Sequence, residues 1–274
     1  MNNKQISFEN ELILHLLTQK HLKKLFDIKC VASEIQLNNL RLDNLAYDEK
    51  ANAFVIIEYK NRFSANVLSQ AQDYYNLVLK NKKFFLKRLK NPKNVNFDNT
   101  RVMIISPKFS KKQIRQTKSN FELWWVSLYE DLHIEYRQLK TGHKRTLKVE
   151  EDDLRLSEED LLKNKSDEII ELYHTLMDCI AEKFKNIGYK ILVDEISFNA
   201  NGKLICNVKF LKKSFNAYFH ATELVDEKQK LRDISNKGTG GKANYEFKLN
   251  SKRDLKYFTS LFKQSYDMKV NCNE

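Results

Sequence analysis

The chain has 274 residues, and its 48 lysines and arginines outnumber its 36 aspartates and glutamates, which gives a formal net charge of +12. This length accommodates two ordinary domains or one large one, and a hydrophobic content of 42% is typical of a soluble globular protein. With two prolines and six glycines, the composition argues against long flexible linkers and against a many-turned all-β fold.

The positive charge is concentrated in the first half of the chain. Residues 1–140 hold 24 basic and 14 acidic residues, whereas residues 141–274 hold 24 and 22. A basic half predicts a polyanionic partner, usually nucleic acid or an acidic membrane surface. A general excess of lysine in the proteins of the source organism would also raise the net charge, but it should raise it in both halves of the chain.

The cysteines and the hydropathy pattern indicate the compartment. Four widely separated cysteines, with no C-x-x-C pair, predict a reduced, cytoplasmic environment. The apolar stretch at residues 1–17 is too short and too charged for a signal peptide. No run approaches the roughly 18 apolar residues of a membrane span, so we expect no membrane partner.

Hydrophobic periodicity predicts an alternation of helices and strands in the first half. The expected elements are, in order, a helix over 7–27, strands over 31–37, 40–47 and 53–59, a helix over 64–90, a strand over 101–106, a helix over 111–119 and a strand over 123–129. This order predicts an α/β (α+β) fold, in which helices flank a mixed sheet. A turn at residues 48–52 suits a hairpin between the second and third strands.

An acidic run over residues 146–171 suggests a junction between two domains. We therefore expect a first domain over 1–145, an acidic connector over 146–165 and a smaller α/β domain over 166–274. The elements expected in the second domain are a helix over 167–187, strands over 191–198, 203–210, 217–221 and 245–249, and a helix over 251–266. The glycine-rich loop at 238–241 lacks the spacing of a phosphate-binding loop.

One expected strand ends abruptly in Glu58-Tyr59-Lys60. Side chains alternate along a strand, so Glu58 and Lys60 point to one face and Tyr59 to the other. A carboxylate and an ammonium at a strand end are what a metal ligand and a water-orienting lysine require. Most Glu-x-Lys pairs at strand ends are surface ion pairs, however, so this pair alone is a weak signal.

Asp43 strengthens the pattern, because it interrupts the alternating apolar residues of the preceding strand. If the two strands form a hairpin, Asp43 and Glu58 lie near one another and can share a cation. Mg²⁺ binds through oxygen, typically to one or two carboxylates together with waters and substrate phosphate. The pattern therefore predicts a metal-dependent phosphodiesterase site.

Residues 11–75 resemble the PD-(D/E)XK nuclease superfamily, and within it the RecB-like and NucS-like DNA endonucleases. In that family a helical glutamate comes first, then an aspartate on the second strand, Glu-x-Lys on the third, and a glutamine and a tyrosine one turn apart on the next helix. The matching residues are Glu11, Asp43, Glu58, Lys60, Gln70 and Tyr74. Leu42 stands where the family name has proline, and Leu40 where many relatives have glycine.

The resemblance implies a restriction-endonuclease-like fold and an endonuclease that hydrolyses DNA in restriction, phage defence or repair. It also implies a Mg²⁺ cofactor, for which Mn²⁺ can substitute. Asp43, Glu58 and the backbone carbonyl of Tyr59 would hold the metal. Lys60 would position or deprotonate the attacking water and stabilise the charge that develops.

Five further residues are candidates for the same site. Glu11 would act through the water shell of the metal, and Gln70 would steady the lysine or the nucleophile. Glu34 interrupts an apolar strand and is read either as a neighbour of the site or as a surface glutamate at a strand edge. Arg41 and Tyr74 are candidates for supporting the site.

Two basic groups in the first half are candidates for contacts to nucleic acid. The residues are Lys82, Lys83, Lys87 and Arg88 in the first group, and Lys111, Lys112 and Arg115 in the second. Each group could equally be a solvated helix face, but their location in the half that carries the site favours substrate contact.

The second half resembles a small α/β domain of unknown function that often follows such nucleases. The matching residues are 213–219, 231–235, 238–240 and 264–266. We expect this domain to bind substrate, a partner or a second subunit, and a homodimer stays open because double-strand cutters often pair two sites. The alternative to an endonuclease is a catalytically inactive nucleic-acid-binding or assembly protein that retains the nuclease fold.

Overall fold

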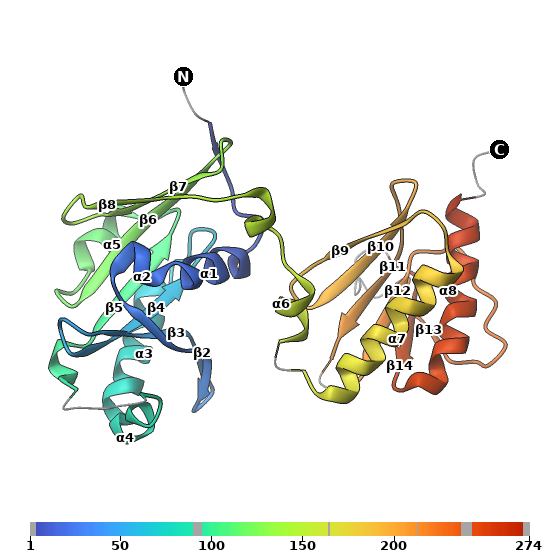
Figure 1. Ribbon diagram of the computed structural model, residues 1–274, viewed down its shortest axis with the longest axis horizontal. Coiled ribbons are helices and arrows are strands. Elements are labelled where there is room, and N and C mark those ends of the chain that lie inside the picture. The colour runs from blue at the N-terminus through green and yellow to red at the C-terminus, as the bar shows by residue number, and fades with distance from the viewer. Residues whose placement is uncertain (1–3, 90–94, 164, 212, 237–242, 271–274) are drawn as a thin grey trace. The chain divides into compact units, whose positions relative to one another are not determined.

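The computed structural model describes residues 4–89, 95–163, 165–211, 213–236 and 243–270 (Figure 1). The chain forms two compact units, Met1–Arg155 and Leu156–Glu274. The division between them falls inside the expected connector. The glycine-rich loop at 238–241 lies outside the described residues.

The first unit combines helices with a large sheet. Its helices are α1 (Glu11–Lys20), α2 (Leu22–Phe26), α3 (Val67–Lys80), α4 (Lys82–Leu86) and α5 (Lys111–Gln116), with the 3-10 turns η1 (Phe97–Asn99) and η2 (Glu151–Leu154). Its strands are β1 (Gln5–Ile6), β2 (Lys29–Leu37), β3 (Leu40–Asp48), β4 (Ala53–Tyr59), β5 (Arg101–Ser106), β6 (Phe121–Tyr129), β7 (His133–Gln138) and β8 (Lys144–Lys148).

These strands form a mixed sheet in the order β2-β3-β4-β5-β6-β7-β8, with β1 beside β6. The β4–β5 and β5–β6 pairs are parallel, and the other pairs are antiparallel. The expected mixed sheet with flanking helices is confirmed. Every residue of β4 is buried, because β4 lies between two other strands and contacts α1 as well as α3. The apolar run of β4 is therefore that of a central strand.

Two helices position the residues predicted for the site. In α1, the Asn10 side chain accepts a hydrogen bond from the Ile13 N–H at 2.9 Å and caps the helix, which starts at Glu11. In α3, buried residues recur at helical spacing, as at Val67, Ala71 and Tyr74. These three residues belong to the core between α3 and the sheet.

Several expected elements of the first unit were wrong in extent. The helix expected over 7–27 is two helices, because α1 ends at Lys20 and α2 begins after His21, and the helix expected over 64–90 is interrupted at Asn81. Strands β7 and β8 were not expected at all. Their charged residues hide the pattern, since β8 buries only Leu147 within its bounds.

The second unit packs two long helices on an antiparallel sheet. Its elements are α6 (Glu158–Leu162), α7 (Asp167–Lys183), β9 (Ile187–Ile191), β10 (Glu195–Ala200), β11 (Lys203–Phe210), β12 (Phe215–Phe219), β13 (Leu231–Asp233), β14 (Tyr245–Leu249), η3 (Lys252–Asp254) and α8 (Leu255–Val270). The strand order is β13-β14-β12-β11-β10-β9. Helices α7 and α8 lie on one face of this sheet (Figure 1), where aromatic side chains such as Tyr173, Phe258 and Phe262 fill the core.

The second unit also corrects the expectations. The single strand expected over 191–198 is instead the last residue of β9, a turn at 192–194 and the first part of β10. The first helix was expected to reach residue 187, but α7 ends at Lys183 and the chain turns into β9, which pairs with β10. The short strand β13 was not expected. Within the described residues, no helix has both the length and the apolar character that crossing a membrane requires.

The expected acidic connector is shorter than residues 146–165. Its first residues belong to β8, and Leu147 and Val149 are buried in the first unit. At its other end, Leu161 of α6 is buried in the core of the second unit. The acidic side chains mask these apolar residues, which dock the two ends of the segment onto different units.

Candidate active site

The candidate site begins with two carboxylates at the end of β4. The antiparallel register pairs Asn44 of β3 with Ile57 of β4, so Asp43 comes opposite Glu58 where the ladder ends. The Asp43 carboxylate accepts a hydrogen bond from the Tyr59 backbone N–H at 3.0 Å. The expected hairpin is thus confirmed, and it brings Asp43 beside Glu58.

Glu58 is a completely buried carboxylate, with 0% of its side chain exposed. Its Oε2 atom has no hydrogen-bond donor among the described residues. Burial, together with the adjacent Asp43 carboxylate, raises the pKa of Glu58 to about 8. A buried carboxylate is costly unless a proton or a cation compensates it. The Asp43–Glu58 pair therefore suits a bound divalent cation.

The Lys60 ammonium supplies part of that compensation. Its Nζ atom lies 2.8 Å from Glu58 Oε1 and 3.1 Å from Glu11 Oε1, and it donates to the Tyr59 carbonyl at 2.7 Å. Burial opposes the charge, but the Glu58 and Glu11 carboxylates outweigh it and raise the pKa of Lys60. A single cation thus already contacts two of the oxygens expected to hold the metal.

Glu11 reaches this lysine from α1, and its side chain remains 42% exposed. The capped first turn of α1 fixes the position from which it reaches across to the end of β4. Glu11 therefore joins the expected group through Lys60, 49 residues along the chain.

Gln70 and Tyr74 approach the site from α3. The Gln70 amide donates to the Tyr74 hydroxyl at 2.7 Å, as expected for residues one turn apart. Burial raises the pKa of Tyr74, the Gln70 hydrogen bond opposes this, and the Glu58 and Asp43 carboxylates add to it. Gln70 was expected to steady the lysine or the nucleophile. In the structure its hydrogen bond goes to Tyr74 rather than to Lys60, and its contact to the nucleophile stays a prediction.

Glu34 and Arg41 are more peripheral. The Arg41 Nη1 and Glu34 Oε2 atoms are 3.9 Å apart, and the two side chains are 64% and 40% exposed. Within the described ranges, no three His, Cys, Asp or Glu side chains form a group able to hold a metal. The carboxylates that could hold a metal together are therefore those of Asp43 and Glu58, while Glu11 contacts Lys60 and Glu34 forms a surface ion pair.

A buried polar network behind the site was not anticipated. The Tyr59 hydroxyl donates to Asn44 Oδ1 at 2.7 Å, and the Asn44 amide donates to Gln19 Oε1 at 2.9 Å. His15 lies 3.1 Å from the same Gln19 oxygen and stacks on the Tyr59 ring. The signal was present in the sequence, because Glu11, His15 and Gln19 are spaced at four-residue intervals on α1. The network links α1 to β3 and β4.

The structure separates the two basic groups. Helix α4 follows the far end of α3, whose 14 residues extend about 20 Å from the end that carries Gln70. Within this group, Lys82 lies over the Phe97 ring at 5.0 Å, and Arg88 stacks on Phe84 at 3.9 Å. Both cations contact rings of the protein itself, and Arg88 is partly buried, while Lys82, Lys83 and Lys87 are exposed.

The second basic group, on α5, lies on the site side of α3. The buried Gln113 of α5 donates to the Ser64 carbonyl at 2.7 Å, in the loop between β4 and α3. Lys111, Lys112 and Arg115 are exposed, and none of them forms an ion pair within the described residues. Of the two groups, α5 is therefore the better placed for contacts to a substrate at the site.

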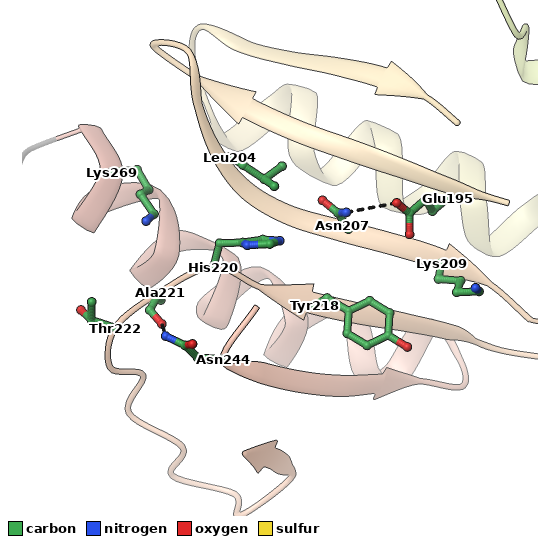
Figure 2. Close-up of a pocket in the computed structure, with 10 residues that line it drawn as sticks. All are labelled: Glu195, Leu204, Asn207, Lys209, Tyr218, His220, Ala221, Thr222, Asn244 and Lys269. Carbon is green, nitrogen blue, oxygen red and sulfur yellow. Dashed lines mark hydrogen bonds between the residues drawn. The ribbon is translucent and has the colours of Figure 1, made fainter. Parts of the chain in front are cut away.

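The second unit has a pocket on its sheet that the sequence did not suggest (Figure 2). Glu195 there accepts a hydrogen bond from the Asn207 amide at 3.1 Å, and Lys209 pairs with Asp194 at 3.0 Å. Burial and the Asp194 carboxylate raise the pKa of Glu195. Tyr218 and other polar side chains line the same pocket.

No family model matches the chain, and no solved structure matches it. The chain is similar to an uncharacterized protein from Haemophilus influenzae, with 28% identity over an alignment of 286 residues that covers 96% of this chain and 94% of the relative. The similarity thus extends through both units.

Proposed function

We propose that this chain is a metal-dependent endonuclease that hydrolyses phosphodiester bonds in DNA, with its active site in a restriction-endonuclease-like first unit. The observation that carries the proposal is the Asp43–Glu58 carboxylate pair, with the Lys60 ammonium 2.8 Å from Glu58. Two carboxylates and an ammonium at one strand end provide ligands for a cation and a donor for the reacting water or phosphate.

The donor set fits a hard divalent cation. Asp43, Glu58 and the Tyr59 carbonyl would hold Mg²⁺, or Mn²⁺ in its place, and all three supply oxygen. The donor-free Oε2 of the buried Glu58 is the observation that supports this fit. When bound, such a cation neutralises charge on the phosphate and lowers the pKa of a water.

The chain's own residues then orient the reaction. The Glu58 and Glu11 carboxylates keep Lys60 protonated, and its three N–H groups face Glu58, Glu11 and the Tyr59 carbonyl. The two that face the oxygens expected to hold the cation would turn to the attacking water and the phosphate oxygens when those oxygens bind it. The Gln70 amide donates a hydrogen bond to the Tyr74 hydroxyl, and the Glu58 and Asp43 carboxylates help to raise the pKa of that hydroxyl. Both side chains therefore lie on the face of α3 that is directed toward the carboxylates. The network behind Tyr59 fixes α1, and with it Glu11, against the sheet.

A cleavage assay tests the proposal. Plasmid and short double-stranded, single-stranded and branched DNA are incubated with the full chain in Mg²⁺, Mn²⁺ or EDTA. We expect cleavage that requires a divalent cation and is lost in Asp43→Ala and Lys60→Ala. Cleavage that survives both substitutions would contradict the site. Salt-sensitive DNA binding without cleavage under any condition would instead favour the inactive nucleic-acid-binding alternative.

A further inference from the structure

An exposed aromatic ring lies beside the candidate site. Among the described residues of the first unit, Phe63 is the one large hydrophobic side chain left substantially open to solvent, with 45% exposed. It comes three residues after Lys60, in the loop of residues 61–66 between β4 and α3. Three residues span at most about 10 Å, so Phe63 stays close to the reacting centre.

Hydrogen bonds hold the part of the loop that follows Phe63. The buried Gln113 side chain of α5 donates to the Ser64 carbonyl at 2.7 Å and to the Ala65 carbonyl at 3.5 Å. The Asn66 carbonyl accepts from the Ser69 hydroxyl at 2.8 Å. The loop is thus pinned to α5 and to the first turn of α3, while the ring beside these anchors remains exposed.

The loop that carries this ring and the helix that anchors it are basic. Arg62 precedes it and is exposed, as are Lys111, Lys112 and Arg115 on the helix that anchors the loop. Neither residues 61–66 nor α5 contains an acidic residue. None of the four cations has an ion-pair partner in the part of the chain that the structure describes.

An exposed aromatic ring on a basic loop that is anchored to a basic helix has the chemistry of a single-strand binding surface, where rings stack on bases and cations follow the phosphates. We propose that Phe63 stacks on an unpaired nucleobase, so that the substrate of the site is DNA with unpaired nucleotides next to the scissile phosphate. This inference rests on the proposed function. A paired base is already covered by its neighbours in the duplex, whereas an unpaired base can offer its face to the ring.

Binding is measured first, in EDTA, so that the result does not depend on cleavage. The probes are an oligonucleotide duplex carrying 2-aminopurine in an unpaired flap and a fully paired duplex with 2-aminopurine at the same position. With the full chain, we expect fluorescence quenching on the flap substrate. Phe63→Ala should abolish the quenching and weaken flap binding by roughly five- to a hundredfold, while duplex binding changes less than twofold.

Three further variants separate stacking from other effects. Phe63→Tyr should retain quenching and affinity, whereas Phe63→Leu, which keeps an apolar side chain but no ring, should behave like Phe63→Ala. Val225→Ala removes another exposed apolar side chain, in the second unit, and should behave like the unmodified chain. Equal losses on flap and duplex in Phe63→Ala, or wild-type behaviour of Phe63→Leu, would overturn the inference.

Cleavage of the same two substrates in Mg²⁺ distinguishes this inference from the proposed function. We expect the flap substrate to be cut faster, and Phe63→Ala to remove that preference. If both substrates are cleaved at equal rates and Phe63→Ala changes neither rate, the inference about Phe63 is contradicted, while the proposed endonuclease function is retained. If quenching depends on Phe63 but neither substrate is cleaved, the proposed endonuclease function is contradicted, and the inference that Phe63 binds a base is retained.

Discussion

Each sheet of this protein carries a glutamate whose pKa is raised, first by burial and then by a neighbouring aspartate. In the first unit these residues are Glu58 and Asp43, and in the second they are Glu195 and Asp194. The residue types are the same, yet the two places differ in how completely the protein covers the glutamate.

The difference lies in the partners that the fold supplies. Lys60 pairs directly with the fully buried Glu58, whose Oε2 keeps no hydrogen-bond donor among the described residues. At the second sheet, Lys209 pairs with Asp194, and an amide side chain satisfies Glu195 in an open pocket. The presence of an aspartate beside a glutamate is thus not enough to make a cation site. The pair suits a cation when the surrounding helices and strands bury it, as they do for Asp43 and Glu58.

The largest expected effect separates the two lysines. Lys60→Ala should lower the rate of Mg²⁺-dependent DNA cleavage by about 10²–10³-fold, because a preorganised donor next to the reacting phosphate is lost. Lys209→Ala should leave the rate within about twofold, since Lys209 pairs only with Asp194. Initial rates on one substrate compare them. A similar loss of cleavage rate in Lys60→Ala and Lys209→Ala would contradict the assignment of the active site to the first unit rather than the second.

The next effect concerns pH. Because the folded chain raises the pKa of Glu58 from an ordinary value of 4.5 to about 8, it holds this proton more tightly than the unfolded chain does. In EDTA, the stability of the protein should therefore fall as pH rises from 4.5 to 8. Glu58→Gln should flatten this dependence and be more stable at pH 8 by on the order of 2–4 kcal/mol.

Urea unfolding between pH 5 and 8 measures this effect, with Glu195→Gln as the matched control. The control should change the pH dependence much less, because Glu195 lies in an open pocket. Parallel stability curves for the unmodified chain and Glu58→Gln would show that the buried carboxylate does not retain its proton.

A smaller effect is expected on DNA binding. Replacing Lys111, Lys112 and Arg115 by alanine should weaken DNA binding. The slope of the logarithm of the binding constant against the logarithm of the salt concentration should become shallower by up to about 0.9 for each phosphate contact that is lost. The control replaces three basic residues of the second sheet, Lys209, Arg232 and Lys248. Fluorescence anisotropy at several salt concentrations gives both slopes. A larger change of the slope in the control than in the α5 variant would indicate that the second unit carries the nucleic-acid-binding surface.

The smallest effect concerns two tyrosine hydroxyls. Tyr59→Phe should lower the free energy of unfolding by about 1–2 kcal/mol, because it leaves the buried Asn44 Oδ1 without its donor. Tyr218→Phe, in the open pocket, should cost within about 0.5 kcal/mol. Thermal unfolding of the two variants compares them. Equal costs would show that the network behind the site does not stabilise the fold.

Much of the first unit could be predicted because its pattern is local. The apolar run of β4 and the alternation of β3 mark two strands, and the turn between them sets a hairpin that carries Asp43 to Glu58. Gln70 and Tyr74 share a helix face because their spacing is one turn. Strands β7 and β8 escaped prediction, because their few buried residues, Ile134 and Tyr136 in β7 and Leu147 in β8, stand between charged and polar neighbours.

Which residues could do chemistry, and on which elements they lie, can be read from the order of the amino acids alone. Three facts needed the folded chain: Lys60 lies between Glu11 and Glu58, α5 rather than α4 adjoins the site loop, and Phe63 remains exposed there. The two kinds of information differ in range. Periodicity and turn chemistry act over a few residues, whereas burial, pKa and ion pairing depend on elements that meet from distant parts of the chain.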